Sequence, residues 1–501
     1  MSSDETVLAD LGYRQEFKRD FSRFELFGLS FSIMGIVQSI ASILFYSIPY
    51  GGPVSMVWGW LAGSVFIICI ALAISELGSS APTSGGLYYW TFMYSSPRYR
   101  KFLSWLIGYV NTIGYIAGVA AVDYSCAVAI LTAATLGSDG TYEPTTAQIY
   151  GVFCALLASH ALLASLATKV IARLQIVYVL LNIAVFFAIV IAIPAATPVE
   201  LKNDAKYAFG HFENLSGYPD GFAFFMSFLA PLWTIGGFDT PVHISEEAKN
   251  ARTAVPFAIM SATTLGCILG FVVNICLVLN MGTDLVSIIA SPIGQPMATS
   301  RDQGHDCLLG VHNHDLVYGG NGPPSRQAFA FSRDGALPLS AFLYKMNSYT
   351  GTPANCVCVC AIIAAMLGLL SFAGSAAIGA IFTMGIACQY ICYCTPVVAR
   401  FLGGQSFTPG PFNLGRASGP VASVASVFMI FMIVVLFFPT TPGPVAQDMN
   451  YSSVVVGGTI ILASMYYFVS GQFWFTGPVT TVQDECAEKR TSVGTSSQGS
   501  K

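Results

Sequence analysis

Charged side chains are scarce in this sequence. Asp, Glu, Lys and Arg make up only 10% of its 501 residues, whereas hydrophobic residues make up 54%. Soluble domains carry about 25% charged residues. A chain so poor in charge could not stay soluble, so we expect a membrane protein with several spans embedded in a lipid bilayer. The net charge of −4 is too small to indicate a nucleic-acid partner.

The sequence also lacks the side-chain clusters that an enzyme needs. Outside one anomalous segment, residues 300–325, no catalytic His, Ser or metal ligands gather at one depth. We therefore expect no enzyme, no cofactor and no metal site. The 13 cysteines are scattered through apolar runs, where cysteine usually acts as a small core residue.

Apolar runs of bilayer length fill most of the chain. They predict an all-α polytopic protein with eleven clear spans. The runs cover residues 27–49, 54–75, 102–136, 146–167, 172–196, 221–241, 256–281, 353–373, 376–402, 420–438 and 452–475.

Lys and Arg are placed asymmetrically around these runs. If the N-terminus is cytosolic and a twelfth span crosses near residues 300–325, only Lys202, Lys206 and Arg301 fall outside, and the other nineteen of the 22 fall inside. Basic residues favour the cytosolic side. The charges therefore predict twelve spans, with cytosolic tails at residues 1–26 and 476–501.

Residues 222–256 join an apolar run to features that break a helix. Gly236 and Gly237 are followed closely by Asp239 and Pro241. A glycine pair beside a proline interrupts the backbone ladder, and in hydrocarbon this is tolerated only inside protein or beside a water-filled cavity. Many secondary transporters hold a charged substrate at such a broken helix. The alternative is a re-entrant bend or a helix that ends at Gly237.

The first span is interrupted as well, because it contains Gln38, Ser39, Ala41 and Ser42. Small and hydroxylated residues mark close helix packing or an opened backbone. Interruptions in spans one and six are typical of an inverted five-plus-five repeat. The predicted divisions are 27–196 for the first repeat, 197–402 for the second, and 420–475 for two C-terminal spans.

Residues 76–91, ELGSSAPTSGGLYYWT, closely resemble the span 2–3 motif of fungal amino-acid permeases. FSIMGIVQSIAS, HISEEAKNARTAVP and SRQAFAFSRDGALP are similar too. The whole is most similar to fungal GABA permeases and their amino acid/choline relatives in the amino acid–polyamine–organocation (APC) superfamily.

This resemblance implies a LeuT-like fold and proton-coupled secondary transport of GABA or a related amino acid. The plasma membrane is the expected location, with the vacuolar membrane as an alternative. Choline, polyamines or neutral amino acids are alternative substrates. A nutrient receptor that signals without transport is an alternative function.

The resemblance also assigns roles to residues. Trp233 matches an aromatic residue that covers the bound substrate in the superfamily, and Gly236-Gly237 match the unwound turn of span six. Asp239 matches an acid that links gate movement to protonation in some members. The opened part of span one matches Gln38, Ser39, Ile40, Ala41 and Ser42.

The carboxylate and the amine of an amino-acid substrate each require particular binding partners. A carboxylate is expected at the backbone N–H groups that follow Ser39. An amine is expected at the carbonyls where span six breaks, at the ring of Trp233 or Phe238, or at the buried carboxylate of Asp123. Asp123 is also the alternative to Asp239 as the proton site.

Three further acids are expected to have other roles. Glu246 and Glu247 are predicted to form a solvated inner gate, and Glu76 to be structural at the cytosolic end of span two.

Residues 300–325 do not form an apolar run, although span eight is due there. His305, Asp306, Cys307, His312 and His314 imitate a zinc site. Codons for His, Asp, Asn and Tyr become codons for Ile, Met or Thr when read one base later. We therefore interpret the segment as span eight replaced through a frameshift or mis-spliced gene. A metal site and a divergent loop are the alternatives.

Overall fold

The computed structural model describes residues 3–138, 141–165, 168–289, 322–445 and 449–480. Within these residues the chain is built of helices and loops, and no β-strand is present beyond two isolated backbone bridges. Ten helical stretches are long and apolar enough to cross a membrane. The predicted all-α polytopic fold is therefore confirmed.

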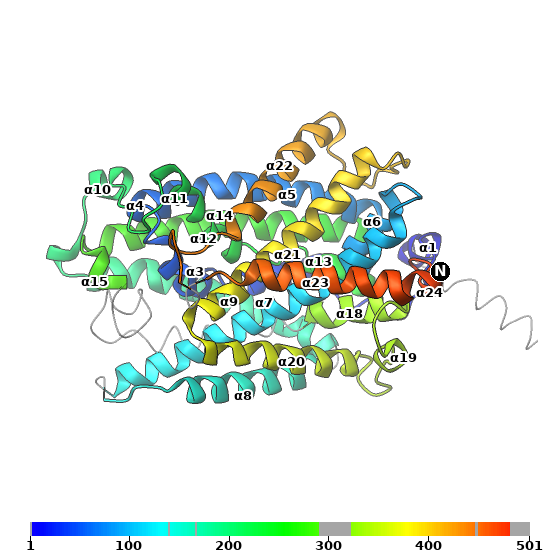
Figure 1. The fold of residues 1–501 in the computed structure, drawn as a ribbon, viewed down its shortest axis with the longest axis horizontal. Coiled ribbons are helices and arrows are strands. Elements are labelled where there is room, and N and C mark those ends of the chain that lie inside the picture. The colour runs from blue at the N-terminus through cyan, green and yellow to red at the C-terminus, as the bar shows by residue number, and fades with distance from the viewer. Residues whose placement is uncertain (1–2, 139–140, 166–167, 290–321, 446–448, 481–501) are drawn as a thin grey trace, which may run out of the picture.

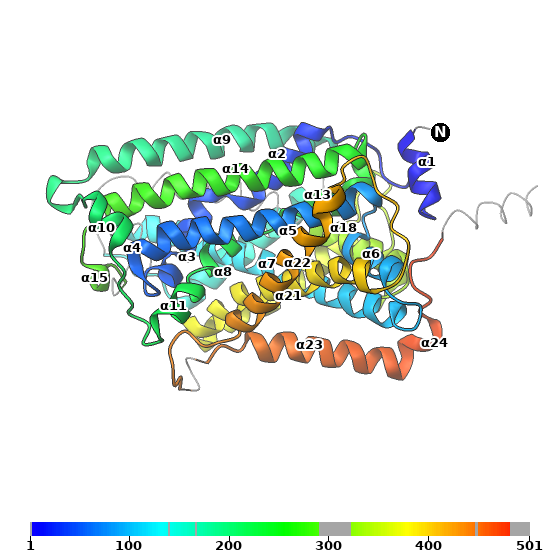
Figure 2. The same ribbon diagram turned by 90° about the horizontal axis from the view of Figure 1, so that it is seen from above.

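The long helices lie side by side along the long axis of the molecule (Figures 1 and 2). The helices are α1 (Ser3–Asp10), α2 (Arg23–Met34), α3 (Ile36–Ser47), α4 (Gly52–Val54), α5 (Trp60–Ser80), α6 (Gly86–Tyr94), α7 (Arg100–Gly137), α8 (Thr146–Ala164), α9 (Thr168–Ala196), α10 (Ala205–Gly210), α11 (Asp220–Met226), α12 (Leu229–Thr234), α13 (Thr240–His243), α14 (Ala251–Asn280), α15 (Leu285–Ile289), α18 (Gly322–Arg333), α19 (Ser340–Leu343), α20 (Ala354–Gly368), α21 (Ser375–Leu402), α22 (Ser418–Leu436), α23 (Ser452–Tyr466) and α24 (Gln472–Trp474).

Local sequence signals set several helix starts. Ser22 caps α2, because its hydroxyl accepts a hydrogen bond from the Glu25 N–H while the Glu25 carboxylate accepts one from the Ser22 N–H. Thr145 and Gln148 form the same reciprocal arrangement at the start of α8. Such capping boxes satisfy N–H groups that the first turn of a helix leaves without partners.

Ten of the eleven predicted spans correspond to the ten long helical stretches. The remaining one, residues 221–241, is divided into α11, α12 and the start of α13, as expected for a broken helix. The run 102–136 belongs to a single helix of 38 residues, α7. That helix is much longer than the roughly 20 residues that cross a bilayer.

Both terminal segments lie at the same end of the bundle. The Tyr13 hydroxyl and the Val479 N–H both donate to the carboxylate of Asp334, at 3.3 and 3.1 Å. The twelve spans predicted from the charges require both termini on one side of the membrane, and the number of crossings stays a prediction. The predicted disruption at residues 300–325 lies almost wholly outside the described residues and stays a prediction.

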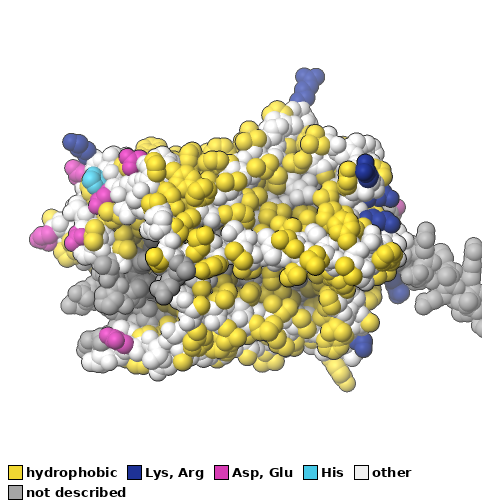
Figure 3. All heavy atoms as spheres, in the orientation of Figure 1, with side chains coloured by type: hydrophobic (Ala, Val, Ile, Leu, Met, Phe, Trp, Pro, Cys, Tyr) yellow, Lys and Arg dark blue, Asp and Glu magenta, His cyan; other side chains and the backbone are white. Residues whose placement is uncertain are grey.

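The sequence has two Asn-x-Ser sequons for glycosylation, Asn214-Leu215-Ser216 and Asn450-Tyr451-Ser452. The loops that carry them lie close to each other. Tyr50 pairs with Asn214 through a backbone bridge, and its hydroxyl donates to the carbonyl of Thr440, at 2.8 Å, in the loop that leads to Asn450. On the face drawn in Figure 3, most Lys and Arg side chains gather toward the end where Figure 1 marks the N-terminus. The cytosolic position of both tails stays a prediction.

We expect a topology with Asn214 and Asn450 outside and the C-terminus in the cytosol. Glycan acceptor sites placed near Asn214 and near Asn450 should both be modified, because only luminal or external loops meet the glycosylation machinery. An acceptor site after residue 480 should remain unmodified. Glycan addition there, measured as a gel shift that is reversed by glycosidase, would reject this topology.

Candidate functional site

The first span is broken at Gly35. This residue has φ 42° and ψ 60°, so it ends α2 and precedes α3. Left-handed backbone favours glycine because a side chain would clash there. The prediction that the backbone opens at Gln38–Ser42 is therefore wrong, since these residues are helical in α3. The break comes three residues earlier, and the Ser39 hydroxyl donates to the freed carbonyl of Met34 at 2.7 Å.

The sixth span is broken between α12 and α13. Gly237 has φ 74° in this turn. The Gly236 N–H donates to the Trp233 carbonyl and the Thr240 N–H to the Gly237 carbonyl, at 3.0 and 3.1 Å. A tight turn thus replaces the regular helix ladder. The opened backbone that was predicted at Gly236-Gly237 is confirmed.

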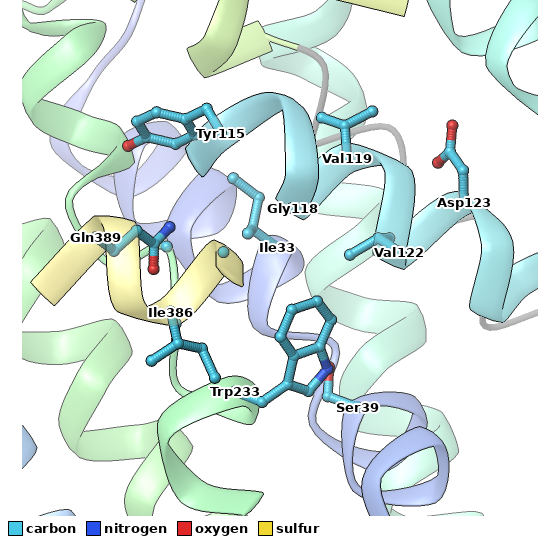
Figure 4. A pocket seen from close by; sticks show the side chains of 13 residues that line it. Ile33, Ser39, Tyr115, Gly118, Val119, Val122, Asp123, Trp233, Ile386 and Gln389 are labelled. Atoms are coloured by element: carbon cyan, nitrogen blue, oxygen red, sulfur yellow. The ribbon is translucent and has the colours of Figure 1, made fainter. Parts of the chain in front are cut away.

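A cavity of about 80 Å³ lies between the two breaks. Figure 4 shows the lining residues that surround it: Tyr115, Val119, Val122 and Asp123 on α7, Ile386 and Gln389 on α21, and Trp233 and Ser39 on the interrupted spans. The lining residues are Ile33, Ser39, Tyr115, Gly118, Val119, Val122, Asp123, Trp233, Gly236, Gly237, Gly385, Ile386 and Gln389.

The cavity brings together only part of the predicted site. Five predicted residues line it, namely Ser39, Asp123, Trp233, Gly236 and Gly237. Six do not, namely Gln38, Ile40, Ala41, Ser42, Phe238 and Asp239. Phe238 is buried against the ring of Tyr393 instead, with ring centroids 5.3 Å apart.

Tyr115 and Gln389 were missed by the sequence analysis. Tyr115 and Val119 precede Asp123 by eight and four residues, so the three share one face of α7. Once Asp123 is taken as a site residue, this spacing predicts Tyr115 as a second one. Gln389 is a lone amide within the apolar α21, and its polarity at mid-helix was the available signal.

Asp239 lies in a buried polar cluster just beyond the cavity. Tyr115 donates to its Oδ2 at 2.6 Å, and Tyr393 donates to its Oδ1 at 2.7 Å. The Nε2 atom of His243 lies 3.5 Å from the same Oδ2. Because Tyr115 also lines the cavity, it connects Asp239 directly to the space where a ligand would sit.

Asp123 lies at one end of the cavity and faces another histidine. Its Oδ2 is 3.4 Å from Nδ1 of His160 on α8, and both side chains are fully buried. The carboxyl group points away from Trp233 (Figure 4). The geometry thus directs Asp123 more toward α8 than toward the centre of the cavity.

The predicted solvated gate at Glu246 and Glu247 is wrong, because both residues are buried. Arg333 donates to both oxygens of Glu246, at 3.0 and 3.1 Å, and Arg326 donates to Glu247 at 2.9 Å. Ser84 adds its N–H to Glu246, at 3.0 Å. These ion pairs connect the end of span six to α18, near both termini.

Burial would raise the pKa of Glu246, but Arg333 and the hydrogen bonds from Ser84 and Thr83 outweigh it and hold the pKa below its usual value. The neighbouring Asp334 behaves differently. Burial raises its pKa to about 6, although Arg333 and the hydrogen bonds that Asp334 accepts oppose the rise. One acid of this cluster therefore stays ionised at neutral pH, and the other titrates near pH 6.

The sequence was also compared with known proteins. A family model described as amino acid permease matches residues 21–461. The chain belongs to the amino acid permease family.

Individual permeases match over nearly the whole chain. A GABA-specific permease of Saccharomyces cerevisiae is 36% identical, over 96% of this chain and 87% of the relative. Amino-acid permease 2 of Neurospora crassa is 34% identical, over 95% and 90%. An amino-acid permease of Schizosaccharomyces pombe is 35% identical, over 97% and 90%. The predicted family is thereby confirmed, and the cavity is the candidate substrate site of a permease.

Gly237→Ala should impair transport by this permease. The substitution adds strain of about 1–2 kcal/mol for a left-handed residue, and its Cβ would lie 3.0 Å from Cγ2 of Ile33. We expect uptake to fall by about tenfold or more at equal membrane abundance. Gly151→Ala in α8 is the matched control, because its Cβ would meet no atom within 4 Å. Normal uptake by Gly237→Ala would remove this turn from the site.

Asp334 should make the stability of the permease depend on pH. Its folded pKa of about 6 exceeds the ordinary value of 3.8, so its contribution is fully present below pH 3.8 and is lost as pH rises through 6. The loss is at most about 3 kcal/mol. Unfolding midpoints in detergent at about pH 5 and about pH 7.5 should therefore differ more in the wild type than in Asp334→Asn. Equal pH dependence in both proteins would contradict this assignment.

Proposed function

We propose that this permease imports GABA or a related amino acid together with protons, by alternating access around the cavity between spans one and six. The observation that carries the proposal is the pairing of two broken helices at one cavity. Ser39 near the start of α3 and Trp233 near the end of α12 both line this cavity. A zwitterion needs a partner for each of its two charges.

The carboxylate of the substrate binds at the start of α3. No side chain caps this helix, so the N–H groups of its first turn are available to an anion. The positive end of the helix dipole adds a favourable term of about 0.3–1 kcal/mol, or more where the site is buried. Ser39 lines the cavity at this point.

The amine binds where span six opens. The carbonyls of the last turn of α12 accept hydrogen bonds, and the ring of Trp233 offers a cation–π surface. The amide oxygen of Gln389 is a further acceptor on the cavity wall. Between the two polar ends the wall is apolar, with Val119, Val122 and Ile386. An apolar middle suits the methylene chain of an ω-amino acid such as GABA.

Proton coupling is assigned to Asp239, which lies in the segment that joins α12 to α13. An ionised Asp239 accepts hydrogen bonds from the hydroxyls of Tyr115 and Tyr393. Protonation of Asp239 would weaken these hydrogen bonds, because a neutral carboxyl group is a weaker acceptor than a carboxylate. Protonation would then bias the equilibrium between conformations. Asp123, bonded to His160, is the competing proton site.

Other functions fit the cavity less well. A polyamine would place two cations in a cavity whose buried carboxylate, Asp123, is already turned toward His160. A choline headgroup would leave the N–H groups of α3 without an anion. A receptor that signals without transport remains the alternative, and uptake measurements separate it from a transporter. We assign the protein to the plasma membrane, with the vacuolar membrane as the alternative.

Uptake of labelled GABA, a neutral amino acid, choline and a polyamine in a permease-deficient host tests the function. We expect accumulation of GABA or a related amino acid that increases at acidic external pH. Asp239→Asn should abolish accumulation against a gradient, whereas Asp123→Asn should keep the wild-type pH profile. Absence of uptake of every candidate, with the protein present in the membrane, would favour the receptor. Accumulation by Asp239→Asn with an unchanged pH profile would exclude Asp239 as the coupling residue.

A further inference from the structure

His243 is a fully buried histidine at the end of α13, four residues after Asp239. Its Nδ1 lies 3.0 Å from the backbone carbonyl of Ser84. Its Nε2 lies 3.5 Å from Oδ2 of Asp239 and makes no hydrogen bond within the described part of the chain. The ring is thus fixed at one nitrogen and faces an acid with the other.

The hydrogen bond to Ser84 decides where the imidazole carries its first proton. A backbone carbonyl only accepts hydrogen bonds, so Nδ1 must be the donor. In a neutral ring Nε2 is then a bare lone pair. That lone pair would face a carboxylate oxygen across 3.5 Å, and two acceptors in contact repel each other. The arrangement becomes favourable when one further proton is placed between Nε2 and Oδ2.

Among the described residues, the hydrogen-bond partners of this pair are uncharged side chains and a backbone carbonyl. From α7, the ring of Tyr115 packs edge-on against His243, with centroids 5.2 Å apart, and its hydroxyl donates to Asp239. From α21, Tyr393 donates to Asp239, and the Cys392 thiol lies near enough to interact electrostatically with the acid. From the loop after α5, His243 meets only the Ser84 carbonyl in a hydrogen bond. An added proton is thus the positive charge that completes the cluster.

We propose that His243 and Asp239 together bind the transported proton, and that Nε2 of His243 is the atom that takes it up. This inference rests on the proposed proton-coupled transport. A proton from the outer aqueous phase forms the N–H bond at Nε2, and the resulting imidazolium pairs with Oδ2 of Asp239. The same N–H bond breaks when the proton leaves to the cytosol.

The position of His243 also connects proton binding to the buried ion pairs near the termini. Ser84, which accepts from His243 through its carbonyl, donates through its own N–H to Oε1 of Glu246 at 3.0 Å. Glu246 is the partner of Arg333. When the proton leaves, repulsion between Nε2 and Asp239 displaces the ring and loosens the Ser84 segment that supports this ion pair. The protonation state of the pair is thereby transmitted to the ion pairs at the end that carries the termini.

His243→Asn is the direct test, because the Asn amide can still donate to the Ser84 carbonyl but has no nitrogen at the position of Nε2. The full-length protein is reconstituted into liposomes that contain a pH-sensitive dye, with GABA as the probe. We expect the variant to exchange labelled for unlabelled GABA across the membrane. Its substrate-dependent proton uptake should be lost, its accumulation ratio should fall to equilibrium, and its exchange should no longer vary with pH.

His211→Asn is the matched control, because His211 is an exposed loop histidine paired with Glu213, and it should behave as wild type. His243→Gln, whose amide reaches toward Asp239, provides a second variant if the Asn protein does not fold. It should likewise lose pH dependence. If the wild type takes up GABA with protons and either His243 variant still couples with an unchanged pH profile, the inference is overturned. If the wild type itself moves no protons, the proposed function fails instead.

Discussion

The structure depends on how an interrupted backbone is satisfied inside a membrane protein. Each freed N–H or C=O group costs several kcal/mol in hydrocarbon, so a break persists only where protein or ligand supplies partners. At Gly35 the Ser39 hydroxyl donates a hydrogen bond to the freed carbonyl of Met34. At Gly237 a tight turn recovers part of the ladder. Both breaks lie beside the cavity, where in the proposed function a zwitterion would supply further partners.

Buried charge is the second constraint, and the chain meets it in two ways. Glu246 and Glu247 are neutralised by arginines from α18, which ties the end of span six to a distant part of the chain. Asp239 has hydroxyl partners and one histidine but no arginine. Separating a buried ion pair is strongly destabilising, whereas moving one proton is not. The first arrangement therefore suits a gate, and the second suits a site that changes its charge.

Much of this architecture could be predicted from the sequence, because hydrophobic run length and glycine placement are local signals. The spans and the break at Gly237 follow from them, whereas the place of Trp233 beside the cavity was expected from the family resemblance. The break in span one was misplaced because hydroxyl residues drew attention to Ser39, whereas the single Gly35 has the left-handed φ. Tyr115 and the arginine partners of Glu246 and Glu247 were missed because they depend on packing between distant segments.

The turn that lines the cavity and the polar cluster behind it both lie within the nine residues from Ile235 to His243. Gly236 and Gly237 line the cavity, while Asp239 and His243 form the polar cluster behind it. Tyr115 touches both, because it lines the cavity and donates to Asp239. In the proposed transport, a ligand at the turn and a proton at the cluster would act on this one segment. Thermodynamic linkage would then require each to change the affinity for the other, which is the condition for coupled transport.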